Sequence, residues 1–365
     1  MFNCPSSIKP RIVSASYRCV PPYLKPNLRT LSGLNQPGVK PPSEDRAQGQ
    51  FRAIPITMTT SRPRRDLPVE ESRSELKRHF GGFEGGSANG AGWADLWDKG
   101  DFLPWDRNMP SPALPDTLLN HSKLIGNANY TINDELRRKR ALVPACGRGY
   151  DVLLLESFGY DVIGLECSAT AVREAKAWAE SHADDYNVKD EALGKGTRRY
   201  ICGDFFKDDW LEEAGLGKSG KFELIYDYTV PLPHLLIDEV FAYQKLKFFC
   251  ALEPNARASW AKRMTELLAS HAQANLICLE FPTMKPPSKG GPPFASPPKA
   301  YMEHLSHPGE EIDYEQEGSV RMNPLRPSST GGLERVGHWH PADTHNIGKS
   351  ENGEVEDWIS VWRHR

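Results

Sequence analysis

The chain has 365 residues and a formal net charge of −3 at pH 7, which is enough length for one large α/β domain or two small ones. This charge gives no reason to expect a nucleic-acid or membrane-surface partner, and no apolar run approaches the roughly 20 residues that cross a bilayer. The seven cysteines form no C-x-x-C pair. That pattern favours buried thiols in a reducing compartment over a disulfide framework or a metal site.

Residues 1–88 are rich in Pro, Ser and Arg and end in the glycine-rich run GGFEGGSANGAG. Such a segment cannot bury enough surface to offset its ordering entropy, so we predict a disordered extension before a folded domain over 89–365. Six basic residues precede the first acid, Glu44, as in a mitochondrial transit peptide. Several prolines would break the helix that such a signal needs. We therefore expect a cytoplasmic protein, with mitochondrial import as the alternative and Met58 as another start.

From residue 141 onward, apolar strand-like runs alternate with helical patterns. Strands are predicted at 141–146, 161–166, 199–202, 222–228 and 275–281, and helices at 150–158, 169–181, 209–214, 254–270 and 298–304. This alternation implies an α/β fold with a parallel sheet covered on both faces. Two further strands, 335–339 and 358–362, predict a C-terminal antiparallel hairpin. The result is a Rossmann-like, mostly parallel seven-stranded sheet, which is the plan of class I methyltransferases.

The turn after the first of these strands reads ACGRGYD over residues 145–151. It has the first two glycines of a dinucleotide fingerprint and lacks the third. Glu166 lies 19 residues beyond Gly147, at the end of the next strand, where an acid can accept hydrogen bonds from a ribose. Asp204 and Phe205 follow the third strand, where they could hold an adenine. Together these features favour S-adenosylmethionine over a dinucleotide, because a methionine tail has no pyrophosphate to bind.

Several ordered blocks then identify a resemblance. They read GWADLWDKGDFLPWD, ALVPACGRGYD, VIGLECS, GDFF, FELIYDY, FCALEPNARASWAKRM, LEFPTMKPPSKGGPPF and DWISVW. The chain from Trp93 to Arg365 resembles the thiopurine S-methyltransferase-type family, closest to its halide, thiocyanate and thiol methyltransferase branch. The first 88 residues have no counterpart in that family.

The resemblance implies an S-adenosylmethionine site under an aromatic lid. The implied cofactor-binding residues are Trp93, Trp97 and Trp105 as the lid, Ala145 and Gly147 at the methionine part, Glu166 at the ribose, Asp204 and Phe205 at the adenine, and Tyr228 at the methyl side. Aromatic faces attract a sulfonium cation, which agrees with the tryptophans. No dedicated base is identified; Asp106 is a candidate for lid structure as much as for chemistry.

The implied reaction is in-line methyl transfer to a small soft nucleophile: a thiol, thiocyanate, bisulfide or halide. A non-catalytic S-adenosylmethionine-binding protein and a methyltransferase for N or O acceptors are the alternatives. The latter is weakened because Asp227-Tyr228-Thr229-Val230 stands where a [DN]-P-P-[YF] tetrapeptide would be. A dinucleotide-dependent oxidoreductase is disfavoured by the missing third glycine. We expect a monomer acting on a small molecule.

Two departures from the family pattern stand out. Residues 230–247 form an 18-residue insert after the Asp-Tyr strand end, and we hypothesise that they derive from a retained intron of 54 nucleotides. Phe294 stands where plant relatives usually carry Tyr, which puts close identity of substrate in doubt. His338, His340 and His345 suggest packing or substrate-pocket lining more than a metal site, because no carboxylate or cysteine stands at a convincing spacing.

Overall fold

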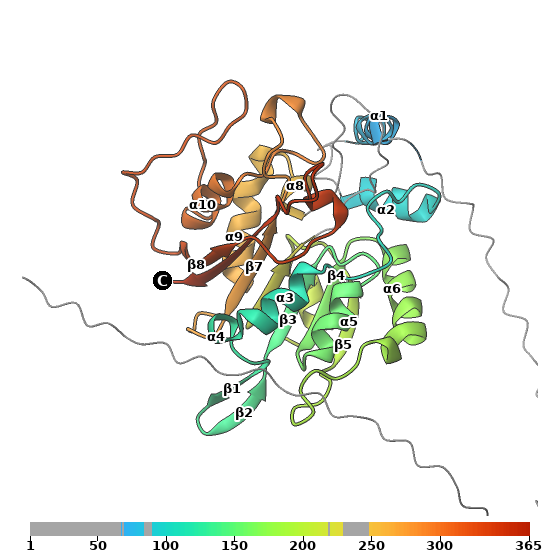
Figure 1. Ribbon diagram of the computed structural model, residues 1–365, viewed down its shortest axis with the longest axis vertical. Coiled ribbons are helices and arrows are strands. Elements are labelled where there is room, and N and C mark those ends of the chain that lie inside the picture. Colours follow the sequence, from blue (N-terminus) through green and yellow to red (C-terminus); the bar gives the residue numbers. More distant parts are fainter. Residues whose placement is uncertain (1–66, 68, 84–89, 218–219, 229–247) are drawn as a thin grey trace, which may run out of the picture. The chain divides into compact units, whose positions relative to one another are not determined.

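A seven-stranded mixed sheet organises the residues that the computed structural model describes, which are 67, 69–83, 90–217, 220–228 and 248–365 (Figure 1). Its strands are β3 (Arg140–Pro144), β4 (Asp161–Glu166), β5 (Arg198–Cys202), β6 (Leu224–Asp227), β7 (Asn275–Glu280), β8 (Leu333–Trp339) and β9 (Trp358–His364). The order across the sheet is β5-β4-β3-β6-β7-β9-β8. The first five strands are parallel, and β9 and β8 pair antiparallel. The predicted fold class is confirmed.

Alternation along the strands divides the hydrophobic core into two layers. Leu142 and Leu276 point into one layer, and their neighbours Ala141 and Ile277 point into the other. The first layer is covered by α7 (Asp209–Glu213), α9 (Arg257–Leu267) and α10 (Pro298–Ser306). The second is covered by α3 (Ala113–Asn120), α5 (Tyr150–Ser157) and α6 (Ala169–His182). Burial of both faces explains why the central parallel strands β3, β6 and β7 are mostly apolar, whereas the edge strand β5 begins with two arginines.

The sheet order places a topological switch point between β3 and β6. The chain runs outward from β3 to β4 and β5, and then crosses back to β6 on the other side of β3. In open α/β sheets, ligands bind outside the carboxyl ends of the strands at such a point. The residues that follow β3, β4, β5 and β6 are therefore the ones that decide the function.

The predicted disorder of residues 1–88 is wrong for part of that range. Helix α1 (Val69–Phe80) lies within it, and its residues Leu76 and Phe80 are buried in a cluster with Trp97 and Trp105. The two apolar residues stand four apart and so share one face of the helix. The surrounding Pro, Ser and Arg content hid this short apolar stripe. Residues 1–66 lie outside the described residues.

Several elements were not predicted. Besides α3, they are α2 (Gly90–Lys99), α4 (Ser122–Ile125), the hairpin β1 (Asn129–Ile132) and β2 (Glu135–Arg138), α8 (Phe248–Ala251), and the 3-10 helices η2 (Ala183–Asp185), η4 (Pro287–Lys289) and η5 (Asn346–Gly348). The 3-10 helix η3 (Pro254–Ala256) and α9 together occupy the helix predicted over 254–270. The hairpin turns at Asn133 and Asp134, whose φ angles of +50° and +63° fit a type I′ turn. Figure 1 shows the hairpin at the opposite end of the sheet from α1 and α2.

The insert at 230–247 lies outside the described residues, which stop at Tyr228 and resume at Phe248. Among the helices that are described, none is both long enough and apolar enough to cross a membrane.

Candidate active site at the carboxyl edge of the sheet

The turn after β3 adopts a backbone that most residue types disfavour. Ala145, Gly147 and Gly149 have φ angles of +50°, +54° and +73°, in the left-handed region that glycine enters without strain. A side chain is excluded at Gly149, because its Cβ would lie 2.3 Å from the ring of Tyr200. Helix α5 begins directly after the turn, at Tyr150. The turn and a helix N-terminus therefore face the same edge of the sheet.

Glu166 closes this turn from the end of β4. Its carboxylate accepts hydrogen bonds from the backbone N–H of Gly147 at 3.0 Å, of Cys167 at 2.8 Å and of Ser168 at 3.3 Å. The residue is only 5% exposed, and burial raises the pKa of its carboxyl while these hydrogen bonds oppose the rise. A carboxylate has about four acceptor positions. The Cys167 thiol also donates to Oε1 at 3.2 Å, whereas Oε2 accepts, among the described residues, only from the N–H of Gly147, so Oε2 has room for one further hydroxyl.

Three tryptophans cover the turn. Trp93 and Trp97 come from α2, and the ring centroid of Trp105 lies 5.7 Å from that of Trp93 and 5.9 Å from that of Trp97. A Cβ at Gly147 would lie 3.6 Å from the Trp97 ring, so Trp97 stands directly over the predicted methionine end. Phe80 of α1 packs behind Trp93 at 4.0 Å between centroids. The predicted lid residues are brought together as one aromatic cluster.

Two carboxylates fasten the segment that follows the lid onto the turn. Asp106 accepts hydrogen bonds from Arg148 Nε and Tyr150 Oη, and Arg148 also pairs with Glu174 at 2.6 Å. Asp151 Oδ1 accepts a hydrogen bond from the backbone N–H of Ser111 at 2.9 Å. Asp106 is thus a structural residue of the lid, in line with the first of the two roles considered for it.

The predicted adenine residues occupy different environments. Asp204 is exposed, lies 3.6 Å from Lys207 Nζ, and accepts a hydrogen bond from the backbone N–H of Phe206 at 3.0 Å. Phe205 is 5% exposed and belongs to the hydrophobic core, whereas the neighbouring Phe206 is 39% exposed. The role of Phe205 at the adenine stays a prediction, and Phe206 is a second aromatic ring at the same strand end.

Tyr228 lies at the end of β6, across the switch point from the turn. It is 2% exposed, and burial raises the pKa of its hydroxyl well above the ordinary value, with Asp357 and Asp151 adding to the rise and Arg107 opposing it. The ring of His345 stacks on Tyr228 at 5.9 Å between centroids and 11° between planes. The hydroxyl is therefore a neutral hydrogen-bond donor at physiological pH.

The structure also places here three residues to which the sequence pattern gave no role: Arg107, Asp151 and Asp357. All three carried a signal, because Arg107 follows the PWD block directly, Asp151 closes the turn motif and Asp357 opens the DWISVW block. His345 was considered only among pocket-lining histidines, and it is now the one of that group that stacks on Tyr228.

The other two histidines make packing contacts. His338 Nε2 lies 3.2 Å from Glu280, and its ring stacks on Trp358 at 4.3 Å. His340 Nδ1 lies 2.8 Å from the backbone oxygen of Asp357. Within the described ranges, no three His, Cys, Asp or Glu side chains are grouped to hold a metal ion.

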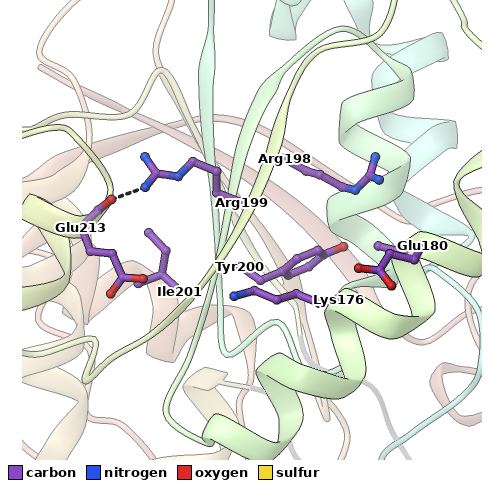
Figure 2. A pocket seen from close by; sticks show the side chains of 8 residues that line it. Lys176, Glu180, Arg198, Arg199, Tyr200, Ile201 and Glu213 are labelled. Carbon is purple, nitrogen blue, oxygen red and sulfur yellow. Dashed lines mark hydrogen bonds between the residues drawn. The ribbon is translucent and has the colours of Figure 1, made fainter. Parts of the chain in front are cut away.

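A hollow of about 360 Å³ beside β5 is separate from this edge. Figure 2 shows Lys176 and Glu180 of α6, Arg199 of β5 and Glu213 of α7 around it. It contains charges of both signs and none of the predicted cofactor residues. Because β5 is an edge strand of the sheet, these charges fit protection of an open edge against pairing with another strand.

The residues at the carboxyl edge fit the predicted cofactor. The chemistry of the donor set carries this conclusion: a buried carboxylate with spare acceptor capacity stands at the β4 end, and aromatic faces stand over the turn. Ribose hydroxyls donate to such a carboxylate, and a sulfonium cation is attracted to aromatic faces.

The comparisons with known proteins agree with this geometry. The sequence profile of the thiopurine S-methyltransferase family matches residues 88–335. "Probable thiol methyltransferase 2" of Arabidopsis thaliana is 31% identical, over 69% of this chain and 86% of that protein. "Thiocyanate methyltransferase 1" of Brassica oleracea is 29% identical over 68% and 84%. "Thiopurine S-methyltransferase" of Shewanella baltica (strain OS155) is 26% identical over 46% and 65%.

The profile matches more than half of the chain, and the first of these relatives is matched along most of its own length. The resemblance drawn from the tryptophan blocks and the turn is thereby confirmed. The chain belongs to the thiopurine S-methyltransferase family and is an S-adenosylmethionine-dependent methyltransferase.

Proposed function

We propose that this methyltransferase acts on a small soft nucleophile: a thiol, thiocyanate, bisulfide or halide. The observation that carries the proposal is the enclosure of the edge, where Tyr228 is 2% exposed and tryptophans cover the turn beside it. Such an enclosure suits a small acceptor better than a macromolecular one. The names of the thiol and thiocyanate methyltransferases among its relatives support the same acceptor class.

The proposal assigns the cofactor to the nine residues predicted from the sequence. Trp93, Trp97 and Trp105 cover it, Ala145 and Gly147 contact its methionine part, Glu166 binds its ribose, Asp204 and Phe205 contact its adenine, and Tyr228 lines the side of the methyl group. When bound, S-adenosylmethionine supplies a methyl group attached to a positively charged sulfur. The residues of the chain bind and orient, and their aromatic surfaces exclude water from the reacting atoms.

The transfer needs little covalent help from the protein. A bond forms between the acceptor sulfur or halide and the methyl carbon, the bond from that carbon to the sulfonium breaks, and its electron pair stays on the departing sulfur. Thiocyanate, bisulfide and halides are already anions, whereas a thiol must first lose its proton to solvent. Holding nucleophile and carbon in line, and removing water from the anion, accounts for most of the rate.

The proposal extends to the setting of the enzyme. It acts as a monomer in the cytoplasm, without a nucleic-acid or membrane partner, and its methyltransferase domain comprises residues 89–365 together with α1. Mitochondrial import is the alternative. The insert at 230–247 begins two residues after Tyr228 in the sequence, so its removal is expected to raise activity.

The test is an acceptor panel with the purified full chain and S-adenosylmethionine. Thiocyanate, bisulfide, iodide and a small aromatic thiol are compared with a catechol and an aliphatic amine, and volatile methylated products are measured in the headspace. A variant lacking residues 230–247 is run in parallel. We expect methylated products from the sulfur or halide acceptors only.

Glu166→Ala serves as the inactive control, because it removes the carboxylate predicted to bind the ribose. Methylation confined to the oxygen or nitrogen acceptors would contradict the proposal. So would the absence of any product from both forms of the chain when S-adenosylhomocysteine binds normally, which would favour a non-catalytic binding protein.

A further inference from the structure

The guanidinium of Arg107 lacks hydrogen-bond acceptors where it is buried. Its Nε and Nη2 atoms are shielded from solvent and find no partner among the residues that the structure describes. Buried polar atoms in proteins are almost always paired, because a buried donor without an acceptor is destabilising. These two nitrogens form one edge of the fork with which arginine binds anions. The observation points to an acceptor that is supplied from outside the chain.

The groups around Arg107 favour an anion in that place. Burial lowers the pKa of Arg107 to about 9, while Tyr228 and Asp106 oppose the change, so the side chain is cationic at neutral pH. Burial also raises the pKa of Tyr226 and Tyr228 well above the ordinary range, and both hydroxyls stay protonated. A cation and neutral hydroxyls converge near the switch point between β3 and β6.

The carboxylates nearby are already engaged by other groups. Asp106 accepts from Arg148 and Tyr150. Asp151 accepts from the backbone of Ser111, and burial raises its pKa to about 7. Asp357 accepts from Thr344 Oγ1 at 2.7 Å. None of these hydrogen bonds involves the buried edge of Arg107, so the fork stays available.

The segment that carries Arg107 is fixed on both sides. Asp106, one residue before it, is held by the cofactor turn through Arg148, and Ser111, four residues after it, is held by Asp151 of α5. The guanidinium is therefore positioned by the same turn that is assigned to the cofactor. The guanidinium also interacts electrostatically with Tyr228, so an anion bound to it would lie near Tyr228, on the side assigned to the methyl group.

We propose that Arg107 binds the methyl acceptor as an anion, with Nε and Nη2 as donors and the Tyr228 hydroxyl close by. This inference rests on the proposed function and adds a specificity-determining residue to it. A thiol is then bound as its thiolate after its proton has gone to solvent, which removes the need for a dedicated base. Thiocyanate, bisulfide and iodide bind as they are. Neutral acceptors gain nothing from Arg107.

The test measures anion binding without turnover. The full chain is saturated with S-adenosylhomocysteine, and sodium thiocyanate is added in an isothermal titration, for the wild type, Arg107→Met and Arg107→Lys. We expect Arg107→Met to weaken thiocyanate binding at least tenfold, and Arg107→Lys to lie between it and the wild type, since it keeps the charge and loses the fork. The Kd for S-adenosylhomocysteine should change less than twofold.

Arg321→Gln is the matched control, because it removes the same charge from an exposed pair with Glu315. KM values complete the test: Arg107→Lys, which keeps a cation and so preserves the fold, should raise KM for thiocyanate more than it lowers kcat. Thiocyanate affinity and KM unchanged in the Arg107 variants, or no thiocyanate binding to the wild type, would overturn the inference. The proposed function fails separately, if the wild type methylates none of the sulfur or halide acceptors.

Discussion

The sheet buries charged groups differently at the two ends of its parallel strands, the amino edge and the carboxyl edge. At the amino edge, Lys139 donates to the backbone oxygen of Ile125 at 3.1 Å, and Arg363 Nε donates to Asn275 Oδ1 at 2.9 Å. Glu223, also at this edge, accepts from the backbone N–H of Arg140 at 2.8 Å and pairs with its guanidinium at 3.3 Å. These side chains satisfy one another and the backbone. They stabilise the fold and leave nothing for a ligand.

The carboxyl edge is built differently. There, Arg107 keeps two buried nitrogens without partners in the part of the chain that is described, and Asp151 is buried deeply enough to raise its pKa to about 7. Burying charge without full compensation costs stability. Charged groups at the amino edge therefore stabilise the fold, whereas those at the carboxyl edge are available for binding. Substitutions at the amino edge should lower the free energy of unfolding, and substitutions at the carboxyl edge should weaken ligand binding.

Glu166→Ala should have the largest effect on binding. Losing a carboxylate that holds both the turn and the ribose should raise the Kd for S-adenosylhomocysteine about 100-fold, or about 2.7 kcal/mol. Tryptophan fluorescence titration measures it. Glu166→Gln keeps one acceptor oxygen for the turn, so its affinity for S-adenosylhomocysteine should fall only about tenfold. Equal Kd values for Glu166→Ala and the wild type would remove Glu166 from the cofactor site.

Glu223→Gln tests the amino edge. Weakening the charged hydrogen bonds to Arg140 should lower the free energy of unfolding by about 2 kcal/mol, measured by urea denaturation. The Kd for S-adenosylhomocysteine, measured well below the unfolding transition, should stay within twofold of the wild type. A large loss of cofactor affinity in this variant would break the separation between the two edges.

Arg148→Met tests the connection between turn and lid. The variant releases Asp106 and Glu174, so the lid should close less firmly and the Kd for S-adenosylhomocysteine should rise about tenfold. Arg173→Met is the control: Arg173 is exposed on α6 and donates to Thr170 Oγ1. Equal affinities in the two variants would show that the Asp106 contact does not serve the cofactor site.

Asp151→Asn should have the smallest effect and a defined pH dependence. Its carboxyl has a pKa of about 7 in the folded protein against 3.8 when unperturbed, so the folded state keeps a proton that the unfolded state has lost. The free energy of unfolding therefore falls progressively as pH rises from about 3.8 to about 7 and changes little above that. Between pH 6 and 8 the free energy of unfolding of the wild type should fall by about 1.4 kcal/mol more than that of Asp151→Asn. The same change in the free energy of unfolding between pH 6 and 8 for the wild type and for Asp151→Asn would contradict this.

The sequence predicted the sheet well because its strands are buried on both faces. The run 275–281 reads NLICLEF, with four apolar residues in succession at 276–279, and the structure places β7 at Asn275–Glu280. Helix α1 was missed because only Leu76 and Phe80 carry its contact with the core. Two apolar residues in a polar, proline-rich context give too weak a periodicity to be recognised.

The geometry of the turn and Glu166 could be predicted from the sequence, whereas the residues that surround Tyr228 could not. Ala145, Gly147 and Glu166 belong to one β-α-β unit, so their spacing along the chain fixes their spacing in the structure. Arg107, Tyr228 and His345 come from three distant parts of the chain and meet only through tertiary packing. No local sequence pattern indicates that these three residues lie close together.

His345 and Asp357 lie near the end of the chain, so the surroundings of Tyr228 are completed late in synthesis and depend on a segment separate from the turn. The turn, Glu166 and the tryptophans are all translated before residue 170, whereas the environment of Tyr228 is completed only after residue 357. A chain that ends before residue 345 therefore lacks the groups that surround Tyr228, although the turn and Glu166 have been translated. Substitutions in the connection between β8 and β9 would likewise change the surroundings of Tyr228 without touching the turn or Glu166.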